Sequence, residues 1–261
     1  MDQSTPSADY PEAATIADFE ANLAAVHANI AAAAARAGRR AEEVRLLPIS
    51  KTVPAERVRL AVAAGCRHLG ENKVQEAKAK AAALADLDLS WSVVGHLQTN
   101  KAKDVVAFAD EFQALDSVRV AQALDRRLQA ADRTLDVLVQ VNTSAEPQKY
   151  GLDPDEVPEF VRGLAEYPTL RVQGLMTLAV FSADTDLVRR CFRRLRDVRE
   201  RVRDMDADLL GAGELSMGMS GDYEVAIEEG STCVRVGQAI FGARATPDSH
   251  YWPSAVGPAS S

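Results

Sequence analysis

The chain has 261 residues, a formal net charge of −8 and 47% hydrophobic residues, which suits one large folded domain. The acidic balance argues against a nucleic-acid partner, because proteins that neutralise phosphates along a duplex usually carry a basic face. The sequence shows neither a secretory signal nor an apolar run of the roughly 20 residues that a membrane helix needs, so we expect a cytoplasmic protein without a membrane partner.

Helical and strand-like segments alternate along the chain. A polar leader, residues 1–15, is expected to be flexible, and a long helix is predicted over residues 16–37. The predicted strands are residues 46–50, 67–70, 91–95, 112–115, 135–141, 170–175, 214–217 and 233–236. The helices predicted after them are residues 54–65, 74–84, 100–108, 118–130, 157–166, 184–205, 223–229 and 238–242. The tail, residues 245–261, is rich in Pro, Ser and Ala and is predicted to be disordered.

This order of strand and helix predicts an α/β fold, a single-domain (β/α)8 TIM barrel over residues 16–244 with an extra N-terminal helix. Short apolar strands without alternation suit a parallel sheet that is buried on both faces. The competing fold, an open doubly wound sheet, usually has a glycine-rich phosphate turn after its first strand. Here the first strand ends in Ser50, Lys51 and Thr52, which favours the barrel.

Two further features have structural interpretations. The cationic stretch at residues 189–203 is interleaved with acidic residues, so we expect a solvated helix face with i,i+4 ion pairs and not an RNA site. Cys66, Cys191 and Cys233 lack metal-ligand spacing and are predicted to be small buried side chains. No metal site is predicted.

Lys51 directly follows the first predicted strand. Functional groups of such barrels lie on the loops that leave the C-terminal ends of the strands. Desolvation there lowers the pKa of a lysine amine toward the range in which it is nucleophilic, as Schiff-base chemistry requires. The alternative is a surface lysine whose charged end reaches water.

The loops after the seventh and eighth strands predict an anion site, because phosphate sites of these barrels commonly form there. Residues 215–221, with Ser216 and Gly218, offer hydroxyls and backbone amides, and Gly237 and Gln238 follow the eighth strand. Two ordinary Gly/Ser turns are the alternative. Arg235 lies in an apolar run and is expected to point into the barrel. Its partner there is either a carboxylate, Glu214 or Glu71, or a ring nitrogen of a ligand.

Several motifs, in one order, carry a family resemblance. They are PISKT (48–52), GENKVQEA (70–77), VVGHLQTNK (93–101), QVNTS (140–144), KYG (149–151), GLM (174–176), LSMGMSGDYEVAI (215–227) and VRVGQAIFGAR (234–244). Together they resemble the pyridoxal phosphate homeostasis protein family, which is similar to the barrel domain of alanine racemases (fold type III) without their second domain.

The resemblance implies a protein that stores, buffers or delivers pyridoxal 5′-phosphate (PLP) and has no expected turnover. It implies that Lys51 forms the internal aldimine, that Arg235 faces the pyridine nitrogen, and that the phosphate lies against the loop of Ser216 and Gly218. Gly237 and Gln238 would complete that phosphate site. It further implies that Asn72, His96 and Met176 lie around the ring. PLP-dependent apo-enzymes are the expected partners, and the chain is expected to be a monomer or a weak dimer.

The alternative function is a PLP-dependent amino-acid racemase. An arginine opposite the pyridine nitrogen keeps that nitrogen unprotonated, which weakens the electron sink but tolerates racemisation. Racemisation also needs an acid/base group on each face of the substrate α-carbon. Alanine racemases take the second group, a tyrosine, from the domain that this chain is expected to lack. No pattern aims Tyr150 or Tyr167 at a ligand, and Tyr223 is expected to pack at a helix start. A ligand-free interaction barrel would leave Lys51, Arg235 and both loops unexplained.

Overall fold

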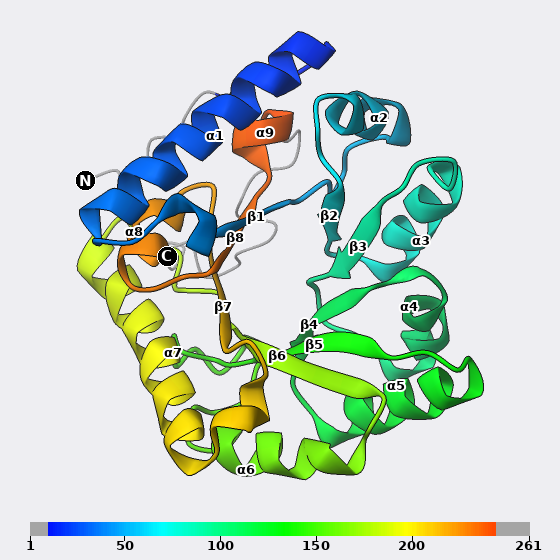
Figure 1. The fold of residues 1–261 in the computed structure, drawn as a ribbon, viewed down its shortest axis with the longest axis vertical. Helices are drawn as coiled ribbons and strands as arrows, with labels where there is room; N and C mark the ends of the chain where they lie inside the picture. The colour runs from blue at the N-terminus through cyan, green and yellow to red at the C-terminus, as the bar shows by residue number, and fades with distance from the viewer. Residues whose placement is uncertain (1–9, 244–261) are drawn as a thin grey trace, which may run out of the picture.

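The computed structural model describes residues 10–243, and its strands form a ring inside a layer of helices (Figure 1). The strands are β1 (Arg45–Pro48), β2 (His68–Glu71), β3 (Ser90–Val93), β4 (Glu111–Leu115), β5 (Leu135–Gln140), β6 (Leu170–Met176), β7 (Glu214–Met219) and β8 (Cys233–Val236). The α-helices are α1 (Ile16–Arg36), α2 (Ala55–Ala63), α3 (Val74–Ala83), α4 (Ala102–Phe108), α5 (Val118–Ala130), α6 (Val157–Gly163), α7 (Thr185–Met205), α8 (Tyr223–Glu228) and α9 (Gln238–Phe241). The 3-10 turns are η1 (Ala41–Glu43), η2 (Thr99–Lys101), η3 (Leu164–Glu166) and η4 (Ala207–Leu210). The predicted tail, residues 245–261, and residues 1–9 of the predicted leader lie outside the described residues.

The predicted barrel is confirmed. All the paired strands are parallel, in the order β1-β8-β7-β6-β5-β4-β3-β2. The ends of this order, β1 and β2, meet through one isolated bridge between Ile49 and Gly70. The main observed difference from the prediction is at β7, which reaches Met219, so that Gly218 belongs to the strand and not to the following loop.

Pro48 accounts for the sparse contact between β1 and β2, which we call the β1–β2 seam. The amide of Ile49 donates to Val236 O on β8 at 2.9 Å, and the amide of Ser50 donates to Gly70 O on β2 at 3.0 Å. Because alternate residues of a strand turn their amides to the same side, the nitrogen of Pro48 faces β2. Proline has no N–H to donate there, so the ladder across the seam cannot extend through this position.

Helix α1 is the extra helix, and it lies beside α8 and α9 (Figure 1). A capping box between Thr15 and Asp18 starts it, because each side chain bonds the backbone of the other. Its apolar face, which includes Phe19, Val26 and Ile30, belongs to one buried cluster with residues of α2, α8 and α9. This helix therefore closes the side of the barrel on which β8 and β1 lie.

The ion pairs of α7 differ from the prediction. We expected i,i+4 pairs within the helix, but Arg189, Arg193 and Arg196 reach across to Glu229, at the end of α8. Within α7 the described ion pairs include only that of Arg199 with its neighbour Glu200. The arginines of α7 thus form ion pairs with the C-terminal end of α8.

The predicted burial of the cysteines is confirmed, since all three are buried and none is in a disulfide. Burial raises the pKa of the Cys66 thiol to about 11 and that of the Cys233 thiol to about 12. No helix within residues 10–243 is long and apolar enough to cross a membrane.

Candidate functional site

The turn between β1 and α2 holds the backbone on both sides of Lys51. On one side the carbonyl of Ser50 accepts from Lys80 Nζ at 2.6 Å. On the other side the amide of Thr52 donates to Glu76 Oε1 at 2.6 Å, and Thr52 has a φ of 65°, which is unusual for a β-branched residue. The sequence therefore places its candidate nucleophile in a turn that is fixed by neighbouring side chains.

A buried carboxylate supports this turn. Glu71 is fully buried at the end of β2, and its Oε1 accepts from Ser50 Oγ and from Lys80 Nζ, both at 2.6 Å. Its Oε2 is buried and has no hydrogen-bond partner among the described residues. Burial raises the pKa of Glu71, although Lys80 opposes this shift. We call Ser50, Glu71, Glu76 and Lys80 the turn clamp.

A cavity of about 320 Å³ opens beside the turn, at the C-terminal ends of β1 and β8. Among the candidate residues it brings together Lys51, Gly237 and Gln238. The hydrogen bond from Ile49 to Val236 joins the two strands directly below it. The remaining lining residues are Glu12, Ile49, Thr52, Val53, Pro54, Arg57, Phe241, Gly242 and Ala243.

The two serines of β7 and its loop have different surroundings. Ser220 Oγ accepts from the amide of Gly237 at 3.2 Å, so this hydroxyl lies next to the cavity. Ser216 is fully buried in the barrel, where its Oγ donates to Gln113 Oε1 and accepts from Arg235 Nη1, both at 2.6 Å. Sequence reasoning placed both hydroxyls in the predicted phosphate loop but singled out Ser216 and not Ser220. The signal that separates them is the end of β7, which lies between them.

Gly218 is required by packing. Its φ is 95°, and a Cβ atom there would lie 2.6 Å from Ala226 Cβ and 2.8 Å from Tyr223 Cα of α8. The absent side chain therefore faces α8 and lets the helix approach the strand.

Arg235 is 3% exposed and points into the barrel. Beyond its bond to Ser216, its Nη2 donates to Thr177 O at 2.7 Å. The ion-pair alternatives were wrong: within residues 10–243, Glu214 pairs with Arg45 and Glu71 pairs with Lys80. Burial lowers the pKa of Arg235 from its ordinary value. Met176 is paired in register with Ser216, so both side chains point to the inside of the barrel.

Asn72 and His96 lie after β2 and β3, outside the lining of the cavity. Asn72 lies against Gly95, where a Cβ atom would be 2.0 Å from Asn72 O. The imidazole of His96 has Nδ1 3.4 Å from Asp116 Oδ2, and its ring stacks on Tyr150 with centroids 3.9 Å apart. Sequence reasoning did not connect Tyr150 with His96, because the loop that carries it has no regular pattern.

The end of the leader also contacts this part of the barrel. Glu12, which lines the cavity, forms an ion pair with Arg57 Nη1 at 2.7 Å. The amide of Ala243 donates to Tyr10 O at 2.9 Å. The sequence did not predict these contacts, which bring segments from both ends of the chain to one side of the cavity.

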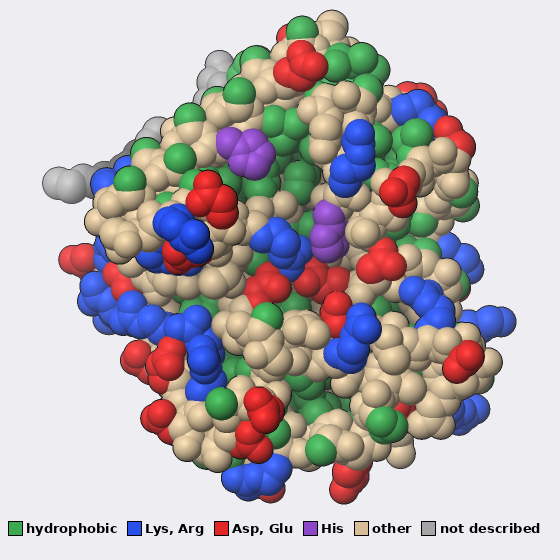
Figure 2. All heavy atoms as spheres, in the orientation of Figure 1, with side chains coloured by type: hydrophobic (Ala, Val, Ile, Leu, Met, Phe, Trp, Pro, Cys, Tyr) green, Lys and Arg blue, Asp and Glu red, His purple; other side chains and the backbone are tan. Residues whose placement is uncertain are grey.

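The opposite, N-terminal end of the barrel carries a second polar cluster. Arg45 Nη2 lies 2.8 Å from Glu111 Oε1 and 2.5 Å from Glu214 Oε1. Figure 2 shows cationic, imidazole and carboxylate side chains gathered at the centre of this end. Over the described part of the chain, no group of three or more His, Cys, Asp or Glu residues could hold a metal ion.

Comparison with known proteins gives the family. Residues 21–245 match the model of the alanine racemase N-terminal domain. A pyridoxal phosphate homeostasis protein of Pseudomonas aeruginosa is 42% identical over 223 residues, which cover 85% of this chain and 94% of the relative.

Solved structures agree with this result. PipY of Synechococcus elongatus, determined with PLP bound, is 34% identical with a TM-score of 0.76, over 86% of this chain and 100% of PipY. An alanine racemase of Clostridium difficile has a TM-score of 0.70 at 13% identity, over 94% of this chain and 61% of the racemase. At that identity the racemase shows only that the barrel fold is shared.

Proposed function

Since this chain belongs to the family of pyridoxal phosphate homeostasis proteins, we propose that it binds PLP and maintains its intracellular supply, without turnover of amino acids. The proposed site is the C-terminal end of the barrel, at the cavity beside Lys51. One observation carries the proposal: Lys51 lines the same cavity as Gly237 and Gln238, so an amine and a candidate phosphate site face one space.

Lys51 is the residue that we propose holds the cofactor. Its amine would condense with the aldehyde of PLP, forming a C=N bond and releasing water, to give a Schiff base. The turn clamp fixes the backbone on either side of Lys51, so the amine is offered from a preorganised turn. Bound PLP is an electron sink for amino-acid chemistry.

The phosphate group fits the loops after β7 and β8. We propose that it lies against Gly237 and Gln238, and that the hydroxyl of Ser220 contacts it. The amides of Gln238 and Ala239 begin α9 and have no acceptor within that helix, which leaves them for an anion. Ser216 and Gly218 lie within β7, where Ser216 donates to Gln113 inside the barrel and Gly218 lets α8 approach the strand.

The ring would lie toward the centre of the barrel. We propose that Arg235 faces the pyridine nitrogen and that Met176, whose side chain points to the inside of the barrel, packs beside it. Asn72 and His96, on the loops after β2 and β3, would border the opposite side of the ring.

Borohydride trapping tests the site. The purified protein, saturated with PLP, should show a visible absorption band that borohydride removes while fixing the cofactor to Lys51 in a peptide map. Lys51→Ala should lose this adduct, and Lys149→Ala, a change in another loop at the same end of the barrel, should keep it. Absence of any adduct in the wild type, or an adduct mainly on Lys73, Lys101 or Lys149, would refute the assignment.

The racemase alternative has one observation in its favour, the tyrosine ring of Tyr150 stacked on His96 at the same end of the barrel. We expect the PLP-loaded protein to show no racemisation of alanine, serine or glutamate above background, because a missing second acid/base group costs about 10²–10⁴-fold in rate. Turnover that Tyr150→Phe abolishes would establish the enzyme instead.

Partners are part of the proposal. We propose that PLP-dependent apo-enzymes receive the cofactor and that the chain acts as a monomer or a weak dimer. Mixing the loaded protein with an apo-aminotransferase should restore its activity faster than the measured release of free PLP allows. Restoration at the rate of free release would exclude direct transfer.

A further inference from the structure

A chain of hydrogen bonds crosses the inside of the barrel, and we propose that its members Ser216 and Gln113 are positioning residues that aim Arg235 at the cofactor. The proposal rests on the proposed function, because it assigns Arg235 to the pyridine nitrogen. It adds two residues that touch neither the cavity nor the turn of Lys51.

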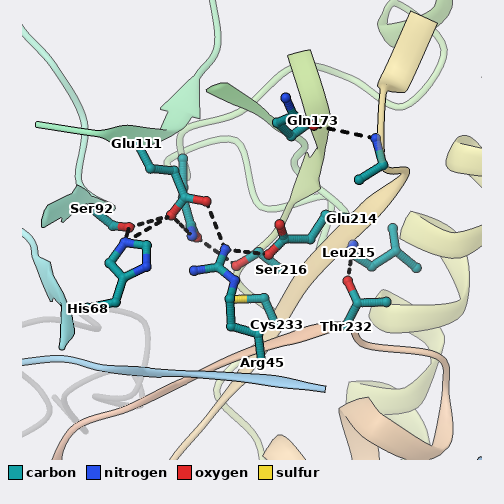
Figure 3. Close-up of polar contacts among 12 residues, drawn as sticks. Arg45, His68, Ser92, Glu111, Gln173, Glu214, Leu215, Ser216, Thr232 and Cys233 are labelled. Carbon is teal, nitrogen blue, oxygen red and sulfur yellow. Dashed lines mark hydrogen bonds and ion pairs between the residues drawn. The ribbon is translucent and has the colours of Figure 1, made fainter. Parts of the chain in front are cut away.

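The chain starts at Arg235 and runs toward the N-terminal end of the barrel. Arg235 Nη1 donates to Ser216 Oγ at 2.6 Å, and Ser216 Oγ donates to Gln113 Oε1 at 2.6 Å. Gln113 Nε2 then donates to Glu111 Oε2 at 2.7 Å. Figure 3 shows the far part of this cluster, with Glu111 between Ser92 and Arg45.

Glu111 fixes the direction of every bond in the chain. Its two oxygens accept from Gln113 Nε2, from Ser92 Oγ and from Arg45 Nη2, with which it also forms an ion pair. Gln113 must therefore turn its NH2 group to Glu111 and its carbonyl to Ser216. The hydroxyl of Ser216 must then donate to Gln113, which leaves its lone pair for Arg235.

The same logic sets the tautomer of His68 at the far end of the chain. The proton of Ser92 is used by Glu111, so His68 Nε2, 2.7 Å from Ser92 Oγ, must carry a hydrogen and donate it. The hydrogen bonds from Gln113 and those from His68 through Ser92 thus end at the same carboxylate, Glu111.

Burial makes this arrangement costly to change. Ser216, Gln113 and Ser92 are fully buried, and Glu111 is 6% exposed. A buried donor or acceptor without a partner loses the hydration that it had in the unfolded chain, so a reversed amide at Gln113 would leave two mismatched contacts. The guanidinium of Arg235 is consequently held at one end by Ser216 and at the other by the carbonyl of Thr177. A guanidinium has five N–H donors, so others remain for a ligand.

Two variants break the chain next to Arg235. Ser216→Ala removes the contact itself, and Gln113→Met removes the residue that orients Ser216 while keeping a similar volume. Ser231→Ala is the matched control, because Ser231 is an equally buried serine between β7 and β8 that bonds only backbone carbonyls. Ser216→Thr keeps the hydroxyl and should therefore retain part of the wild-type affinity and spectrum.

The first readout is the bound cofactor. We expect Ser216→Ala and Gln113→Met to shift the visible absorption maximum of bound PLP in the same direction and to weaken its binding about tenfold, or about 1.4 kcal/mol. The double variant should bind no more weakly than Ser216→Ala, because both changes remove one function. Ser231→Ala should leave both quantities unchanged. Spectra and affinities like those of the wild type in both variants would overturn the positioning role. The proposed function would still stand if the adduct formed on Lys51.

The second readout needs no cofactor. In protein with ¹⁵N-labelled arginine, the Nη signals of Arg235, identified by their loss in Arg235→Lys, should be resolved in the wild type and in Ser231→Ala. They should merge through faster rotation of the guanidinium in Ser216→Ala and Gln113→Met. Unchanged signals in these two variants would overturn the positioning role, even if the wild type failed to bind PLP and the proposed function fell.

Discussion

Ser216 and Ser220 are four positions apart in the sequence, yet only Ser220 lies beside the proposed phosphate site. Ser220→Ala should therefore reduce the affinity for PLP about tenfold, because one hydrogen bond to an anion is lost. Affinity for pyridoxal, which lacks the phosphate, should stay the same. Equilibrium titrations with both compounds measure the two effects.

The control for Ser220→Ala is Ser231→Ala, which should weaken binding of neither compound. An equal loss for pyridoxal and PLP in Ser220→Ala would place this hydroxyl away from the phosphate.

Local patterns predicted part of the candidate site. Lys51, Gly237 and Gln238 were identified because they come just after predicted strands, and the structure brings all three to one cavity. Ser220 belonged to the predicted loop but was not singled out, because the choice between the two serines depends on where β7 ends, and strand ends are poorly marked in sequence. Gln113 was missed because a polar residue inside an apolar strand reveals its partner only when β4 and β7 face each other across the barrel.

At the scale of elements, the turn clamp joins the end of β2 and helix α3 to the turn that carries Lys51. Lys80→Met should destabilise the protein by about 3 kcal/mol at neutral pH, since it leaves the charge of Glu71 buried without its cation. Chemical denaturation of the cofactor-free protein measures the loss. Lys78→Met, in the same helix with an exposed ion pair to Asp104, should cost much less.

The deficit of Lys80→Met should depend on pH. Burial raises the pKa of Glu71, so the folded state binds a proton more tightly than the unfolded chain does. Protonation of Glu71 therefore stabilises the folded protein fully at acid pH. This contribution to the free energy of unfolding is lost as the pH rises through the raised pKa. Lys80 opposes this shift, so its removal raises the pKa of Glu71 further. The loss of stability in Lys80→Met should therefore become smaller as the pH falls from about 8 to about 5. A deficit that is constant over this range would show that Glu71 does not titrate there.

The contact between β7 and α8 predicts a strict requirement at Gly218. Gly218→Ala should destabilise the protein by about 1–3 kcal/mol, because the new methyl group meets α8 and the positive φ disfavours any side chain. Thermal unfolding measures this change. Gly221→Ala, where nothing lies within 4 Å of the added atom, is the control and should be nearly neutral. Equal stabilities would mean that α8 moves aside without cost.

At the scale of the whole molecule, the alternation of strand and helix predicted the barrel because each unit repeats the same punctuation and apolar pattern. The ion pairs between α7 and α8 were not predictable in this way, since Glu229 is far from Arg189 in the sequence. The contact of Tyr10 with Ala243 was missed for the same reason. Sequence periodicity reports which face of an element is buried, but it does not report which element covers that face.

The β1–β2 seam gives the ring of strands one weak side. Backbone amides of β1 and β2 should take up deuterium faster than those of β5 and β6, which are paired with each other at six positions. Mass spectrometry of exchanged peptides measures the difference, and equal protection of the two pairs would contradict it.

Lys51 and Asn72 each come two residues after the bridge between Ile49 and Gly70 that closes the seam. A cofactor held by Lys51 and bordered by Asn72 would connect the ends of β1 and β2 across the β1–β2 seam. Loading should then slow deuterium uptake on β1 and β2 more than elsewhere, because a ligand that binds only the closed form stabilises it by mass action. The cofactor would in this way complete a ring that the chain, with a proline at the join, leaves part open.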